Sequence, residues 1–80
     1  MKILLTDRKD ILKRLREERK KRGITQEALA RRLNCDPKTI SDIETGRRNP
    51  SFEMFINICY ALDLDANYIL YGKKNKENEG

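Results

Sequence analysis

Histidine, tryptophan and valine are all absent from this 80-residue chain. Without histidine, the chain lacks the commonest catalytic base and the commonest metal ligand. Its two cysteines, Cys35 and Cys59, are too few for a secreted disulfide scaffold and have no histidine beside which to bind zinc. The sequence therefore predicts a protein that is not an enzyme and that holds no metal and no cofactor.

Long apolar runs and strand signals are scarce as well. The longest apolar run near the start, Ile3–Leu5, is too short for a signal peptide or a membrane span. No useful stretch alternates apolar with polar residues, and no Asn-Gly or Asp-Gly pair marks a hairpin turn. We therefore expect a single small helical domain in the cytoplasm.

Charge is plentiful and unevenly distributed along the chain. Lys and Arg number 18 against 13 Asp and Glu, a formal net charge of +5. Residues 1–22 hold ten basic and four acidic side chains, whereas residues 51–80 hold three and five. This asymmetry favours a polyanionic partner, either nucleic acid or an anionic membrane surface. A solvated helix face is the alternative, and composition alone does not decide between them.

Helix signals recur along the chain. A charged segment with a narrow apolar stripe, about 7–22, ends at a glycine, and four cap residues announce further helices. The predicted caps are Thr25, Asp36, Ser51 and Asp65, and the predicted stops are Gly23, Asn34, Gly46 and Gly72. The prediction is an all-α fold, a compact five-helix bundle over residues 1–72, with residues 73–80 forming a disordered polar tail.

The second and third predicted helices are separated by about three residues, which suits a helix-turn-helix at about 26–45. In the third helix, 36–45, an inward stripe is followed by a polar outer stripe at helical spacing. The inward residues are Ile40, Ile43 and Glu44, and the outer residues are Lys38, Ser41, Asp42 and Thr45. Such an outer face fits the major groove of DNA, although an ordinary solvated surface has the same appearance.

Several separated segments resemble one family. Residues 12–19 and 23–30 look like the family's opening helices, 38–51 like its recognition helix and loop, and 61–65 like the approach to its fifth helix. The family is that of the lambda-repressor/Cro-type helix-turn-helix regulators, also called the XRE family. The resemblance spans roughly residues 11–72 and implies a lambda-repressor-like DNA-binding domain.

The resemblance also implies roles for individual residues. Those matching positions at base edges or nearby phosphates are Pro37, Lys38, Thr39, Ser41 and Asp42. Those matching positions along the DNA backbone are Thr25, Gln26, Thr45, Arg47, Arg48 and Asn49. Asn34 stands where the family usually has glycine, and Asn tolerates the left-handed conformation. Asp42 is an anion near DNA, so it either accepts from cytosine or only rejects wrong sequences.

Other residues have structural interpretations. Arg19 and Glu44 lie on inward stripes, and the family carries such a pair, so we expect a buried salt bridge that fixes the third helix. Phe52 and Phe55 are assigned to the core, and Cys35 and Cys59 to small buried hydrophobic positions. The last helix is apolar on more than one face, which predicts a homodimer through Tyr68, Ile69 and Tyr71. Residues 3–5 could join that interface or pack on the bundle.

The predicted function is sequence-specific binding of double-stranded DNA by a transcriptional repressor, a nucleoid-associated homodimer on a palindromic operator. No small-molecule effector domain and no membrane association are expected. One alternative is a protein-binding module, such as an antitoxin that masks a toxin and binds DNA only secondarily. A second is a binder of RNA or of nucleic acid in general, although two Phe and three Tyr offer few stacking platforms.

Overall fold

The computed structural model describes residues 7–72, and the regular structure in that range is entirely helical. The helices are α1 (Arg8–Lys21), α2 (Gln26–Leu33), α3 (Pro37–Thr45), α4 (Phe52–Leu62) and α5 (Ala66–Tyr71). The all-α prediction is confirmed, and each boundary lies within a residue or two of the expected one. Residues 1–6 and 73–80, which include Ile3–Leu5 and the predicted tail, lie outside the described range.

Local chemistry explains where the helices begin and end. The side chain of each predicted cap accepts a backbone hydrogen bond in the first turn, as in the 3.0 Å bond from the Ala28 amide to Thr25 Oγ1. Asn34 closes α2 in the left-handed conformation at φ 57°, and Asp63 closes α4 in the same way at φ 54°. Short polar side chains tolerate this conformation, so both helices can end sharply without glycine.

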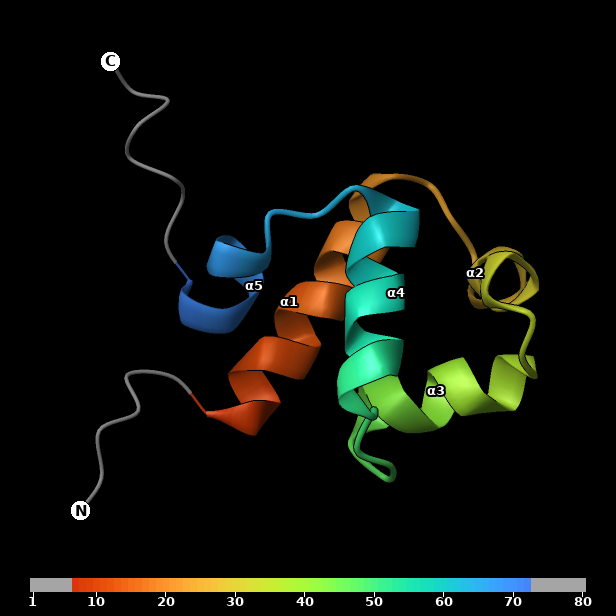
Figure 1. Cartoon of the computed structure of the whole chain (residues 1–80), viewed down its shortest axis with the longest axis horizontal. Helices are drawn as coiled ribbons and strands as arrows, with labels where there is room; N and C mark the ends of the chain where they lie inside the picture. Colours follow the sequence, from red (N-terminus) through yellow and green to blue (C-terminus); the bar gives the residue numbers. More distant parts are fainter. Residues whose placement is uncertain (1–6, 73–80) are drawn as a thin grey trace.

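The core lies where the helices meet. α3 packs against α1 and α2, while α5 packs against α1 on the opposite side (Figure 1). The buried apolar residues are Leu12, Leu15, Leu29, Ala30, Ile40, Ile43, Ile58, Cys59, Leu62 and Ile69. Because α3 buries Ile40 and Ile43, its opposite face is left for solvent. Within residues 7–72, no helix combines the length and apolar composition of a bilayer span.

One core assignment is wrong. Phe55 packs against the core as expected, but the side chain of Phe52 is 81% exposed. Nine of the eleven residues of α4 are apolar, which is more than one helix face can bury in a domain of this size. The core-facing line runs through Phe55, Ile58, Cys59 and Leu62, and Phe52 lies outside it.

Candidate nucleic-acid interface

The outer face of α3 brings the predicted base-contacting residues together. Pro37 and Lys38 are exposed in the first turn of the helix, and Thr39, Ser41 and Asp42 are half-buried along it. The Asp36 carboxylate accepts from the Lys38 amide at 2.9 Å and so fixes the start of the helix. The whole set therefore occupies one polar surface about two turns long.

Asp42 does not stand alone on this surface. Lys38 Nζ lies 3.2 Å from Asp42 Oδ2, and Arg47 Nη1 lies 3.7 Å from Asp42 Oδ1. The two cationic side chains are each 73% exposed, so solvent weakens both ion pairs. The anion is thus flanked by two cations that point toward the same solvent-facing surface.

The residues predicted to follow the DNA backbone lie at the two ends of the helix-turn-helix. Thr25 and Gln26 begin α2, and residues 45–49 form the end of α3 and the loop behind it. The Thr45 hydroxyl donates to the Ser41 carbonyl at 2.9 Å, so it is already engaged within α3. The arginines and the asparagine of the loop, Arg47, Arg48 and Asn49, are exposed.

A buried network fixes α3 to the rest of the domain. Arg19 Nε donates to Glu44 Oε2 at 2.7 Å, and Arg19 Nη2 donates to Glu44 Oε1 at 3.0 Å. The two side chains are only 7% and 5% exposed. Gln26 Nε2 adds a third bond to Glu44 Oε1 at 2.9 Å, and Arg19 Nη1 donates to the Ile24 carbonyl at 2.7 Å. Helices α1, α2 and α3 therefore meet at one carboxylate.

This network gives Gln26 a second role besides the predicted one. Its half-buried amide braces Glu44, and it is the first residue of α2, directly after the cap Thr25. Bracing a side chain on α3 and contacting a phosphate are compatible, because a glutamine amide carries both donors and an acceptor.

Arg8 supports the loop after α3, a role that the sequence did not predict. Its Nε donates to Asn49 Oδ1 and its Nη2 donates to the Gly46 carbonyl, which ties the first turn of α1 to the loop after α3. The partners lie 41 and 38 residues apart in sequence, so no local pattern predicts them. These hydrogen bonds hold the loop that carries Arg47 and Arg48 against the first turn of α1.

Several basic side chains serve the fold. Arg14 donates to the Ile69 carbonyl at 3.0 Å, Arg22 to the Asp63 carbonyl at 3.3 Å, and Arg32 to the Ala61 carbonyl at 3.1 Å. All three bonds satisfy carbonyl groups near the ends of α4 and α5, where a positive charge also complements the helix dipole. The basic excess of the first half of the chain is therefore partly structural.

Glu18 illustrates the same use of charge at the end of α1. Its buried carboxylate accepts from Arg22 Nη1 at 2.7 Å and from Lys21 Nζ at 3.1 Å. The bond from Arg22 lowers the pKa of Glu18 below its ordinary value of 4.5, although burial works in the opposite direction. The same contact raises the pKa of Lys21.

We expect Glu18→Gln to lower the free energy of unfolding by about 1–2 kcal/mol at pH 7, because the charge-assisted bonds to Arg22 and Lys21 are lost. Since folding lowers the pKa of Glu18, its contribution is present above about pH 4.5 and is lost as the pH falls through the folded-state value. The difference between variant and wild type should therefore shrink in acid. Urea unfolding at several pH values measures it, with the exposed neighbour Glu17→Gln as the control. An equal difference at pH 3 and pH 7 would contradict this account.

The cysteines are in the apolar positions expected of them. Cys59 is buried and Cys35 is half-buried against the core. Burial raises the pKa of both thiols, so the reactive thiolate is disfavoured. In the part of the chain from residue 7 to residue 72, no three His, Cys, Asp or Glu side chains gather as a metal site requires.

The predicted dimer residues separate into different environments. Tyr71 is 56% exposed, and Tyr68 is half-buried. Ile69 is 0% exposed, because it points from α5 into the core of its own chain. Including Ile69 in a dimer interface is therefore a mistake, since a side chain already buried offers no surface to a second copy.

Comparison with known proteins gives a consistent result. A family model described as helix-turn-helix matches residues 15–69. Among curated proteins, the chain is 32% identical over 63 residues to the HTH-type transcriptional regulator YqaE of Bacillus subtilis, covering 79% of this chain and 54% of that protein. It is 33% identical over 69 residues to the HTH-type transcriptional regulator ImmR of the same organism, covering 84% and 54%.

A third relative comes from an archaeon. The chain is 44% identical over 48 residues to an HTH-type transcriptional regulator of Methanothermobacter thermautotrophicus, covering 60% of this chain and 70% of that one. The chain spans about half the length of the two Bacillus subtilis relatives. No solved structure matches it.

Proposed function

This chain belongs to the helix-turn-helix family of transcriptional regulators, and we propose that it binds double-stranded DNA sequence-specifically with α3 in the major groove. The supporting observation is the division of α3 into two faces. Ile40, Ile43 and Glu44 hold the inner face, while a polar surface with donors and an acceptor is left outside. This arrangement presents side chains to base edges without disturbing the fold.

Affinity and register come from a second set of residues. Arg47 and Arg48 are exposed beside α3, on a loop that hydrogen bonds from Arg8 hold against α1. Contacts of these arginines with phosphates release counterions, so affinity falls steeply as salt rises. Thr25 and Gln26 add contacts with the backbone from the start of α2.

We infer that the operator is palindromic and that the protein acts on it as a homodimer. A two-fold dimer would place two α3 helices about 34 Å apart on one face of the duplex, one helical turn along it. A dimer that covers two successive turns of a promoter obstructs polymerase, so repression is the regulatory outcome that we propose.

Selection of bound duplexes from a random DNA pool at near-physiological salt tests this function. We expect an inverted repeat whose half-site centres lie about 10–11 base pairs apart. A single short half-site would keep the role of α3 and remove the dimer. No enrichment at all would overturn the proposal of sequence-specific DNA binding by this chain alone.

A further inference from the structure

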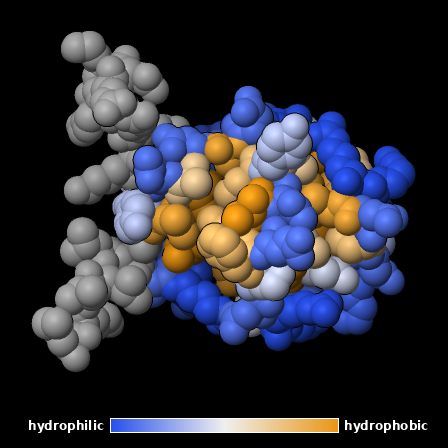
Figure 2. All heavy atoms as spheres, viewed as in Figure 1, coloured by the Kyte–Doolittle hydropathy of each residue, from blue (hydrophilic) through white to orange (hydrophobic). Residues whose placement is uncertain are grey.

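Within residues 7–72, three of the four large hydrophobic side chains exposed to solvent lie along α4, and the fourth, Tyr71, lies on α5. Phe52, Ile56 and Tyr60 are 81%, 46% and 88% exposed. They are spaced four residues apart, so they form one line along the helix, here called the α4 stripe. Figure 2 shows hydrophobic residues gathered over the middle of the face on which α4 lies in Figure 1, with hydrophilic residues around them.

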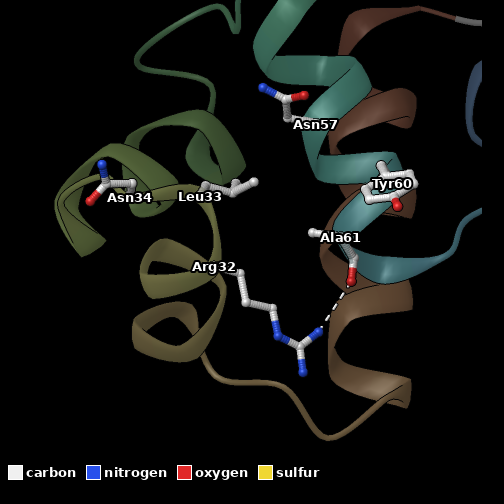
Figure 3. Close-up of a pocket in the computed structure, with 6 residues that line it drawn as sticks. All are labelled: Arg32, Leu33, Asn34, Asn57, Tyr60 and Ala61. Atoms are coloured by element: carbon white, nitrogen blue, oxygen red, sulfur yellow. Dashed lines mark hydrogen bonds between the residues drawn. The ribbon is translucent and has the colours of Figure 1, made fainter.

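Two hollows flank the α4 stripe. One of about 400 Å³ lies between α2 and α4 next to Tyr60, where Leu33 points toward α4 and Arg32 reaches the Ala61 carbonyl (Figure 3). The other, of about 270 Å³, lies next to Phe52, and its lining includes Ile11, Phe55 and Leu70. Two exposed aromatic side chains therefore stand beside concave surface at either end of one helix.

We propose that the α4 stripe is the surface through which two copies of this chain associate. This inference rests on the proposed function, which needs two α3 helices on one duplex. Charge favours a second copy as the occupant, because Glu53 is the one charged residue among the eleven of α4, whereas the whole chain carries +5. Two copies of a cationic chain repel each other least when they associate through the surface that carries the fewest charges.

The position of α3 determines how the two copies are oriented. α3 lies at the end where α4 begins (Figure 1). Residues of both helices line one small hollow there. A two-fold axis parallel to α4 pairs Ile56 with its own counterpart and leaves both α3 helices at the same end of the dimer. An antiparallel pairing sends them to opposite ends, where one straight duplex does not meet both. The paired α4 helices are therefore parallel.

The area that the α4 stripe offers is comparable with the area that a stable dimer interface needs. A stable interface buries about 800 Å² on each partner, and an aromatic side chain contributes about 150–250 Å² when it is buried. Phe52 and Tyr60 thus supply roughly half of the requirement. Ile56 and the rims of the two hollows, which adjoin the stripe directly, supply further surface.

The test compares the α4 stripe with α5, the helix for which the sequence predicts the dimer interface, by changing one exposed tyrosine on each. Tyr60→Glu puts a charge into the α4 stripe, whereas Tyr71→Glu puts the same charge on α5, where the tyrosine is 56% exposed. Sedimentation over a concentration series without DNA measures the dimer dissociation constant. We expect Tyr60→Glu to raise it at least a hundredfold and Tyr71→Glu to change it less than threefold. Both variants should keep the wild-type melting curve at concentrations at which the wild type is monomeric, because association itself raises the melting temperature.

A second experiment tests the parallel orientation of the two α4 helices. Under mild oxidation, Ile56→Cys should form a covalent dimer, since the parallel pairing places this position beside its copy, and wild type should not. Loss of the dimer in Tyr71→Glu alone, a monomeric wild type, or no crosslink in Ile56→Cys would each overturn the proposal. Failure of the proposed function is seen separately: a wild type that dimerises through the α4 stripe but does not bind any duplex would contradict only DNA binding.

Discussion

Replacing Glu44 by alanine is expected to lower the free energy of unfolding by about 3–5 kcal/mol, because Arg19 is left buried without its counter-ion. The Arg19 side chain is 7% exposed, and the acceptor it keeps is the Ile24 carbonyl. A core in a domain of this length rarely supplies more than about 3–5 kcal/mol in total. The variant should therefore be largely unfolded at 25 °C, which circular dichroism and urea titration will show.

Two further variants separate the charge from the packing. Gln26→Ala removes one bond to Glu44 and should cost only about 1–2 kcal/mol. Replacing the pair together, Arg19→Met with Glu44→Leu, leaves no buried charge and should recover most of the lost stability. A Glu44→Ala protein within 1 kcal/mol of wild type would show that the pair does not hold α3 in place.

Asp42→Asn is expected to raise the affinity for unrelated DNA and to lower the preference for the selected operator. The substitution removes an anion from the outer face of α3 and frees the Lys38 and Arg47 side chains that it holds. Affinity for unrelated duplex should therefore rise, with the slope of log affinity against log salt steeper by about one to two per protomer. Preference for the selected operator should fall about tenfold or more, because the neutral amide accepts more weakly from a base amino group than the carboxylate does and no longer repels acceptor groups on wrong bases.

Fluorescence anisotropy with the selected operator and a scrambled duplex, at several salt concentrations, measures both effects. Glu53→Gln is the matched control, because it makes the same change in charge on an exposed residue of α4. If Asp42→Asn and Glu53→Gln behave alike, Asp42 acts only through net charge and not through its neighbours on α3.

The sequence was informative wherever the determining interaction is local. Caps such as Thr25 and Asp36 act within their own first turn, so spacing alone located the helices. The contact between Arg19 and Glu44 is not local, but their opposite charges on two inward stripes, together with the resemblance to the family, predicted it, and the two side chains form a salt bridge. The ion pair between Lys38 and Asp42 also follows from an i, i+4 spacing, although both residues were assigned only to DNA.

What the sequence did not provide depends on how the helices dock. Phe52 was assigned to the core because an aromatic residue in an apolar helix is usually buried, but α4 has more apolar residues than this domain covers. The bonds from Arg8 to the loop after α3, and from Arg14 to the end of α5, join segments that no periodicity relates. Ile69 was predicted to meet a second copy because its helix is apolar on several sides, and only the packing of α5 on α1 shows which side is already used.

The separation of α3 into an anchored inner face and a free outer face has a consequence for how such proteins diversify. Ile40, Ile43 and Glu44 carry the stability, while Lys38, Ser41, Asp42 and Thr45 contribute little to the core. Exchange of the outer residues is therefore nearly neutral for folding. One scaffold can then give rise to many regulators that recognise different operators. Duplicated genes can diverge in DNA specificity through a few substitutions on a single nine-residue helix.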